Sequence, residues 1–361
     1  MIDSRIRFKA YNPKQDSLFP NRVEDWVPEN DLSFFISNIL NEFYKKGHLK
    51  PFYDKFQNRK TAGRAAYSPV MMLGIICYSY AKGIFSSREI EKKLRQDGPF
   101  RYLCDGNFPS YRTICRFRKN HLNDFKDLFV KVINHAANIC NLDFNEIGID
   151  GTKIKANASK LKNRTNSEED QNKPKKINRT DPDSRLMKTS QEGFQQSYNA
   201  QIAVDKKSQL ILSCEVIQKF NDQGELIPMI DETINNVGKK PKVVLADAGY
   251  ANEQDLKELE RRNIEGYVAT KKFKHKKNKE KNKKIKVENE ATRRMSERLS
   301  TPEGRNEYRN RAWIVETPIA WIKRGRRFKQ FCIRGLEHVK GEWNLVCLVQ
   351  NLYRLHSYLK S

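Results

Sequence analysis

The chain has 361 residues, with 69 Lys and Arg against 44 Asp and Glu, so its formal net charge is +25. A charge this large predicts an anionic partner such as nucleic acid. Hydrophobic residues make up 38% of the chain, which excludes an intrinsically disordered protein, and the length suggests about two domains. No apolar run approaches the roughly 18 residues of a membrane span, so we expect no membrane partner.

The N-terminal residues and the cysteines indicate the cellular compartment. Residues 1–5 lack the apolar segment and the cleavage site of a secretory signal, which predicts a cytoplasmic protein. The seven cysteines are odd in number and include no C-x-x-C pair. This pattern favours reduced core thiols over disulfides or a zinc site.

The first part of the chain carries the pattern of an all-helical domain. Apolar residues recur at helical spacing after the capping residues Asn30 and Asp31. Ser86 and Glu89 form the pattern of a capping box, in which each side chain accepts from a free backbone N–H at the helix start. The predicted helices cover residues 31–46, 68–83, 86–97, 110–121 and 122–139.

From Glu146 onward the pattern changes to that of a mixed α/β domain. Short apolar segments predict strands, first in a local meander and then alternating with helices, which indicates a mixed sheet. The predicted domains are residues 1–140 and residues 141–361. The predicted strands cover residues 147–150, 198–204, 210–217, 243–246 and 266–268, and the predicted helices cover residues 224–235, 252–262 and 306–359.

Two basic stretches interrupt the second domain, near residues 155–195 and 268–305. Within the second, Lys271 to Lys286 contains ten lysines and one glutamate. The composition predicts loops. An isolated run of this kind is typical of a solvated surface, but the charge of the whole chain favours contact with phosphate.

Two apolar strands are each followed by an aspartate and a glycine. The first runs into Asp150 and Gly151, and the second into Asp247 and, two residues later, Gly249. The carboxyl ends of strands in α/β sheets are where ligands collect, so we expect the two carboxylates to lie close together. The alternative is turn chemistry, because Asp near Gly commonly ends a strand.

A third carboxylate, Glu316, has cationic and aromatic neighbours. A helix would place Trp313 and Lys323 on the face of Glu316. Pro318 either kinks this helix or marks the start of a new one. The alternative makes Trp313 and Trp321 core residues and Glu316 a member of an exposed ion pair.

Three carboxylates without a neighbouring His or Cys predict a site for a hard cation. Such donors suit Mg²⁺ or Mn²⁺, which keep waters and take phosphate oxygens as further ligands. The implied reaction is phosphoryl transfer, with the surrounding lysines and arginines holding a nucleic-acid backbone.

A basic stripe marks the helix predicted from Ser110. Arg112, Arg116 and Lys119 share one face, and the preceding helix begins at Ser86. Two such helices resemble a helix-turn-helix, although the connection near residues 97–109 is longer than usual. A basic surface on an ordinary bundle helix is the alternative.

Six motifs together resemble the DDE transposases of bacterial insertion sequences, in the branch with a helical N-terminal domain before a ribonuclease-H-like catalytic domain. The resemblance covers nearly the whole chain and implies that fold. The motifs are Ser86 to Glu91, Thr113 to Arg118, Ile149 to Ser159, Tyr198 to Gln201, Ala246 to Tyr250 and Arg334 to Glu337.

The resemblance implies roles for individual residues. Asp150, Asp247 and Glu316 match the catalytic triad that binds Mg²⁺ or Mn²⁺. Two departures from the family pattern occur. The family has an arginine four residues before the glutamate, where this chain has Ala312, and Arg311 stands one position earlier. A lysine-rich segment also replaces a cysteine-bearing one. Asp222 matches an auxiliary acid, and Trp313 an aromatic residue that stacks on a flipped base, although a buried tryptophan is an alternative. Implied DNA contacts come from Lys153, Tyr308, Arg311, Trp313 and Lys323 beside the triad, together with the stripe of Arg112, Arg116 and Lys119.

The predicted function is that of a DNA transposase. It would bind terminal inverted repeats, cleave the element ends and join them to target DNA, as a homodimer or larger assembly on double-stranded DNA in the nucleoid of a bacterium. Two alternatives remain: a ribonuclease-H-like nuclease without strand transfer, and a catalytically inactive nucleic-acid-binding relative.

Overall fold

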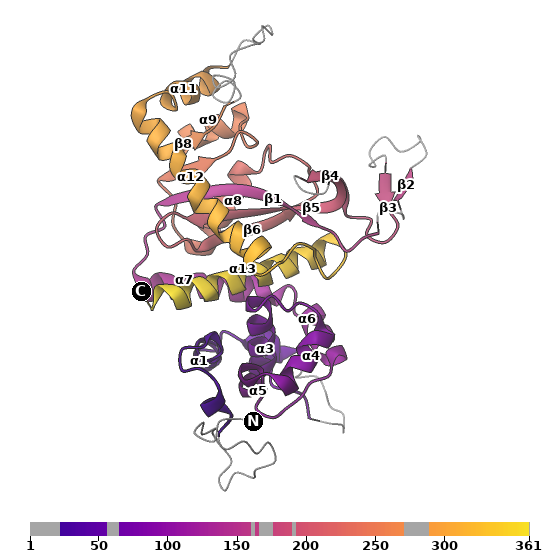
Figure 1. Cartoon of the computed structure of the whole chain (residues 1–361). Helices are drawn as coiled ribbons and strands as arrows, with labels where there is room; N and C mark the ends of the chain where they lie inside the picture. The colour runs from indigo at the N-terminus through magenta and orange to yellow at the C-terminus, as the bar shows by residue number, and fades with distance from the viewer. Residues whose placement is uncertain are drawn as a thin grey trace, which may run out of the picture.

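The computed structural model describes residues 22–55, 65–159, 163–165, 176–189, 193–270 and 289–360. A helical part and a sheet with flanking helices lie one above the other along the long axis of the molecule (Figure 1). None of the helices within these described residues is long and apolar enough to cross a lipid bilayer.

The N-terminal part is all-helical, as predicted. After a short 3-10 helix at Val23–Trp26, the described residues of this part form seven α-helices, two of which the sequence pattern did not predict: α2, and α5 within the connection expected near residues 97–109. The helices are α1 (Leu32–Lys45), α2 (Lys50–Asp54), α3 (Pro69–Ala81), α4 (Ser87–Gln96), α5 (Gly98–Cys104), α6 (Tyr111–Asn120) and α7 (Asp124–Cys140).

The helix starts only partly follow the predicted capping. Asp31 accepts from the backbone N–H of Ser33 at 2.8 Å, and Ser110 accepts from that of Thr113 at 3.4 Å. The capping box at Ser86 is wrong, because the Ser86 side chain makes no capping hydrogen bond. A guanidinium holds this helix start instead: Arg118 donates to the Phe85 carbonyl and to the Ser87 hydroxyl.

The sheet confirms the predicted mixed α/β class. Its path is β4-β5-β1-β7-β8, and β6 also pairs with β5. β1 is antiparallel to β5 and parallel to β7, which is parallel to β8. An antiparallel meander followed by two parallel strands on helical crossovers is the ribonuclease-H-like arrangement. The elements are β1 (Glu146–Lys155), β4 (Arg185–Thr189), β5 (Gly193–Asp205), β6 (Ile211–Ile217), α8 (Leu226–Val237), β7 (Val243–Ala246), α9 (Glu253–Arg261) and β8 (Glu265–Val268).

Parts of the two expected basic loops are regular structure. β4, the start of β5 and a small hairpin of β2 (Asn163–Thr165) with β3 (Lys176–Asn178) lie within residues 155–195, and α11 (Glu290–Arg298) lies within residues 268–305. Composition misled the prediction here, because backbone pairing between strands does not require apolar side chains. The lysine run from Lys271 to Lys286 lies outside the described residues.

The C-terminal stretch is helical but interrupted. α12 (Pro302–Ala320) continues into a π-helix (Trp321–Gly325), and α13 (Leu336–Tyr358) follows after a non-helical connection. Pro318 lies inside α12 without ending it, so the interpretation of a new helix at Thr317 is wrong. The Thr317 hydroxyl instead donates to the Trp313 carbonyl one turn earlier, at 2.7 Å.

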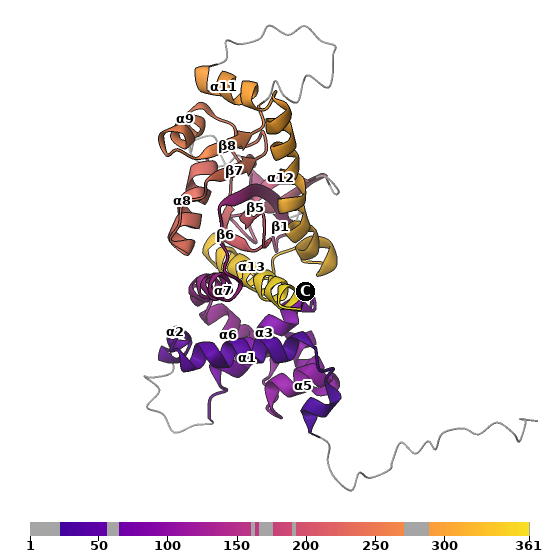
Figure 2. The ribbon, with the colours of Figure 1, turned by 90° about the vertical axis from the view of Figure 1, so that its left-hand side faces the viewer.

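α13 joins the two parts of the molecule. It packs against β6 on one side and against α7 and α3 on the other, and lies between the sheet and the N-terminal helices in both views (Figures 1 and 2). The buried hydrophobic residues accordingly form one continuous cluster. The domain boundary at residue 140 coincides with the end of α7 and stays a prediction.

All seven cysteines are free. Six are buried or half-buried, as expected of core thiols, whereas Cys115 is exposed because it lies on the outer face of α6.

Candidate active site

Two aspartates meet at one edge of the sheet. The parallel pairing of β1 with β7 ends at Ile149 and Ala246, and the next residue in each case is Asp150 or Asp247. Asp150 does not end its strand as predicted, because the antiparallel partner β5 continues and carries β1 on to Lys155. The predicted proximity of the two carboxylates follows from this register.

A third carboxylate, Asp222, reaches the same place from the segment after β6. A Cβ added to Gly249 would lie 2.8 Å from Asp247 Oδ1 and 3.1 Å from Asp222 Oδ2. A Cβ added to Gly151 would lie 2.5 Å from Asp222 Oδ1. We define Asp150, Asp222 and Asp247 as the acidic cluster. Gly151 and Gly249 lie beside it, where a larger side chain would clash with the carboxylates.

Cations border the acidic cluster. Arg311 Nη1 lies 3.3 Å from Asp150 Oδ2, and Lys153 Nζ lies 3.8 Å from Asp222 Oδ1. Burial raises the pKa of the Asp150 carboxyl to about 6, with Asp247 and Asp222 adding to the rise and Arg311 opposing it. Burial disfavours the charged form of Lys153 as well, and for an ammonium group this lowers the pKa. The cluster thus carries crowded negative charge that its own cations only partly neutralise.

We expect Asp150→Asn to stabilise the metal-free protein at pH 8. The pKa of Asp150 rises from 3.8 to about 6 on folding. The contribution of this carboxyl to the free energy of unfolding is therefore fully present below pH 4 and is lost as the pH rises to about 6. A shift of this size corresponds to about 3 kcal/mol, which the neutral amide would recover. Urea unfolding at pH 8 and pH 4 measures it: a gain at both pH values, or at neither, would contradict the assignment.

α12 brings Tyr308 and Arg311 to the acidic cluster, and Glu316 lies on an exposed part of the same helix. The Arg311 guanidinium lies 5.9 Å from the centroid of the Tyr308 ring. Ile314 and Val315 are buried against Gly148 of β1, so the next residue, Glu316, points to solvent. No hydrogen bond or ion pair links Glu316 to another described residue, and its role as third member of the triad stays a prediction.

A basic cavity of about 490 Å³ adjoins α12. Its lining joins Glu316 to the cations at the end of the helix. Lys323 Nζ also donates to Thr152 Oγ1 at 2.9 Å and to the Lys153 carbonyl at 3.1 Å, so this lysine connects the π-helix after α12 to β1. The lining residues are Glu316, Ile319, Ala320, Lys323, Arg324, Arg327 and Lys329.

The two tryptophans of α12 and the π-helix are exposed to solvent. Trp313 is 45% exposed and Trp321 is 46% exposed. The interpretation of both as core residues is therefore wrong. The helix turns its Ile and Val side chains to the sheet and leaves Trp313 on the open side, where an aromatic ring has space to stack.

The donors of the acidic cluster fit a hard cation. Carboxylates are the side-chain ligands of Mg²⁺, which usually takes only one or two of them and completes its shell with water and phosphate oxygens. Among the described residues no three His, Cys, Asp or Glu side chains already gather as a complete metal site. Asp150 and Asp247 would hold the ion, with the remaining ligands coming from solvent and substrate.

The helical part presents a separate basic surface. Arg112, Arg116 and Lys119 are all exposed on α6, as the spacing predicted. α4 packs against α6, and Arg88 of α4 lies over the Tyr111 ring at 5.0 Å, a cation that the sequence pattern did not single out. α5 lies between these helices in the chain, so the pair departs from a tight helix-turn-helix.

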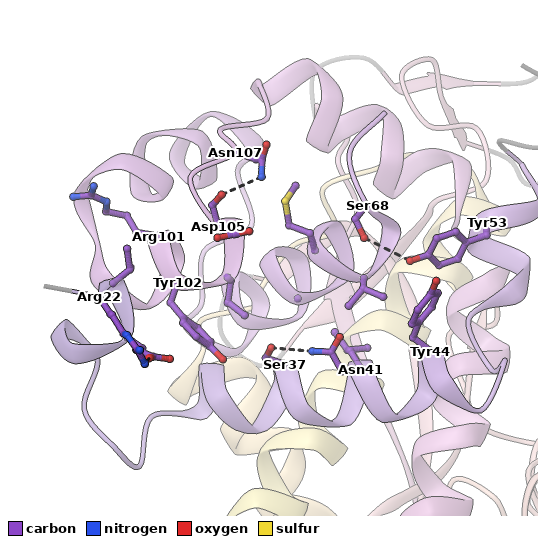
Figure 3. A pocket seen from close by; sticks show the side chains of 17 residues that line it. Arg22, Ser37, Asn41, Tyr44, Tyr53, Ser68, Arg101, Tyr102, Asp105 and Asn107 are labelled. Carbon is purple, nitrogen blue, oxygen red and sulfur yellow. Dashed lines mark hydrogen bonds and ion pairs between the residues drawn. The ribbon is translucent and has the colours of Figure 1, made fainter. Parts of the chain in front are cut away.

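A cavity of about 790 Å³ lies in the helical part, away from the carboxylates. It opens between α1, α3 and α5, with Asn41, Tyr44 and Tyr102 among the side chains at its edge (Figure 3). Ser37 and Asn41 share a hydrogen bond of 3.4 Å along α1. Its lining mixes hydroxyl, amide and apolar groups without the gathered carboxylates of the sheet edge, so it is not the candidate active site.

Two family models, both of transposase domains, match this chain. A family model described as the transposase DDE domain matches residues 145–352, and one described as a transposase domain (DUF772) matches residues 21–120. The Mos1 strand transfer complex aligns with 88% of this chain and 100% of its own at 8% identity and a TM-score of 0.21. A pre-cleavage Mos1 transpososome aligns with 85% and 100%, at 8% identity and a TM-score of 0.20. No curated protein matches the chain significantly.

Proposed function

The chain belongs to the DDE transposases, and from this premise we propose that it binds the terminal inverted repeats of a bacterial element, cleaves the ends by metal-dependent phosphoryl transfer and joins them to target DNA. One observation carries the proposal: Asp150 and Asp247 leave neighbouring parallel strands at one edge of the sheet. Cations flank that edge, so an acidic site lies within a surface suited to a polyanion.

Some residues of the site would bind the metal, and others would contact the DNA. Asp150 and Asp247 would hold Mg²⁺ or Mn²⁺, with Glu316 as a further ligand. When bound there, the metal would activate the attacking water or hydroxyl and stabilise the leaving oxygen. Arg311 keeps Asp150 oriented through its 3.3 Å contact, and Lys153 stands where it can meet a phosphate.

The basic cavity and the exposed aromatic face of α12 extend the DNA surface. Lys323 and its neighbours Arg324 and Arg327 would contact the backbone, and Trp313 would stack on an unpaired base beside the cleavage point. We further propose a homodimer or larger assembly that holds two element ends on double-stranded DNA.

The decisive experiment incubates the full chain with a plasmid that carries the flanking inverted repeats of its gene. We expect Mg²⁺-dependent cleavage at the repeat ends and joining of the freed 3′ ends to a second plasmid. Cleavage without joining would indicate a nuclease, and DNA binding without cleavage would indicate an inactive relative. Either result would overturn the proposal.

The α6 stripe gives a prediction on DNA affinity. Replacing Arg112, Arg116 and Lys119 together by alanine should weaken binding to the element ends, because each exposed cation can neutralise one phosphate. The slope of log K against log salt should fall by about 3 if all three contact phosphates. Fluorescence anisotropy between roughly 50 and 200 mM salt measures this slope.

A matched triple variant controls for the loss of three charges. Lys239, Lys257 and Arg293 are exposed, and each forms an ion pair with a carboxylate at the surface. Their replacement by alanine should lower the salt slope less than the α6 variant does. Equal slopes for the two triple variants would show that the α6 stripe has no special role.

A further inference from the structure

We propose that Asp222 is a metal-binding carboxylate of this site, and that Asn199 and Gln201 hold it in place. The inference rests on the proposed function, because it names a further ligand for the same ion. It starts from the contacts of the two oxygens of Asp222, which differ from one another.

One oxygen of Asp222 is fully engaged. Asn199 Nδ2 and Gln201 Nε2 each donate to Asp222 Oδ1 at 2.7 Å. Asn199 and Gln201 alternate along β5 and face the same side of the sheet, opposite Lys153 and Gly151 of β1. Two donors on one oxygen fix the rotation of the carboxylate, as side chains behind a metal ligand typically do.

The second oxygen of Asp222 lies on the side of Asp247. Asp222 Oδ2 and Asp247 Oδ1 both lie within about 3 Å of the position where a Cβ of Gly249 would stand, at 3.1 and 2.8 Å. Asp222 Oδ2 accepts no hydrogen bond from a described residue. The clamp that Asn199 and Gln201 form on Oδ1 thus leaves Oδ2 without a hydrogen bond from the described residues, on the side where Asp247 Oδ1 lies.

An independent observation indicates a missing ligand at the same spot. Asn199 is fully buried, and its Oδ1 has no hydrogen-bond partner among the described residues. This oxygen lies 3.0 Å from the position of a Gly151 Cβ, and Asp222 Oδ1 lies 2.5 Å from the same position. A buried acceptor without a donor is costly, and a cation or a water in the shell of that cation would satisfy it.

The clamp is itself anchored in the core. Tyr250, three residues after Asp247, donates through its hydroxyl to Gln201 Oε1. Trp343 of α13 donates through Nε1 to the Gln201 carbonyl at 3.1 Å. Because the Gln201 oxygen is occupied by Tyr250, its Nε2 must face Asp222. The hydrogen-bond chain therefore sets the orientation of the Asp222 carboxylate.

Mn²⁺ binding to the DNA-free, full-length protein tests the role of Asp222. A titration followed by the electron paramagnetic resonance signal of free Mn²⁺ reads affinity without requiring activity. We expect Asp222→Asn, which keeps the shape and the acceptor for the two amides, to weaken Mn²⁺ binding at least about tenfold. Asp143→Asn, the same change at an exposed surface ion pair, should leave the affinity unchanged.

A second variant tests the inference even if Asp222→Asn does not fold. Gln201→Met keeps the Asp222 carboxylate but removes one of the two donors that orient it, so Mn²⁺ affinity should again fall while circular dichroism stays that of the wild type. Wild-type Mn²⁺ affinity in a folded Asp222→Asn protein, or no Mn²⁺ binding by the wild type, would overturn the inference. Failure of end cleavage by the wild type would instead overturn the proposed function, since the titration involves no DNA.

Discussion

Asp247→Asn is expected to abolish Mg²⁺-dependent cleavage of element ends while leaving DNA binding intact. The amide has the size of the carboxylate and keeps the acceptor that Gly249 N–H uses at 2.6 Å, so the turn after β7 should survive. The negative charge that would hold the cation is lost. We expect a rate reduction of at least about 100-fold, the scale of removing one electrostatic contact to a transition state. Asp150→Asn should act alike, because Gly151 N–H bonds Asp150 Oδ1 in the same manner.

DNA affinity separates loss of chemistry from loss of structure. Removing a carboxylate beside a polyanion should leave the affinity for end DNA equal or raise it. Asp143→Asn serves as the matched control, because the Asp143 side chain is 70% exposed and pairs with Lys239 at the surface. Cleavage at the wild-type rate by Asp247→Asn would remove that residue from the site.

Glu342→Ala is expected to give the largest loss of stability. Glu342 is fully buried in α13 and accepts from the Tyr80 hydroxyl at 2.7 Å and from the backbone N–H of Cys332 at 2.8 Å. Arg118 of α6 also donates to the Tyr80 hydroxyl, at 3.0 Å. Truncation would leave Arg118 as an uncompensated buried charge, which costs about 3–5 kcal/mol.

Urea unfolding of the full chain measures this cost. The control is Glu337→Ala on the same helix, whose side chain is 82% exposed and should change the free energy of unfolding by no more than about 0.5 kcal/mol. Glu342→Gln should fall between the two, because it keeps an acceptor and loses the charge. Equal stability of Glu342→Ala and Glu337→Ala would mean that this network does not join the helical part to α13.

Much of the fold was predictable because local patterns and tertiary packing agree. Apolar periodicity identified α1, α3 and α7, since each buries one or more faces in the common core. The full length of β1 was not predictable. Its second half, from Gly151 to Lys155, is polar and becomes a strand only through pairing with β5, about fifty residues later in the chain.

The acidic site was predictable in part for a similar reason. Asp150 and Asp247 each follow an apolar strand, and parallel pairing of those strands suffices to bring them together. The clamp on Asp222 depends on the register of β1 against β5, which places Gln201 opposite Gly151 and is not visible in either segment alone. The exposure of Glu316 depends on which face of α12 meets the sheet, and this face is the one that carries Ile314 and Val315.

A sulfur substitution at the scissile phosphate tests most directly whether the acidic cluster performs metal-dependent phosphoryl transfer. Replacing a non-bridging oxygen by sulfur weakens contact with Mg²⁺, a hard cation, more than contact with Mn²⁺. We predict that end cleavage of this substrate by the wild type is suppressed in Mg²⁺ and restored in Mn²⁺, and that Asp150→Asn cleaves in neither. Equal cleavage in both metals, or unchanged cleavage by Asp150→Asn, would contradict the account.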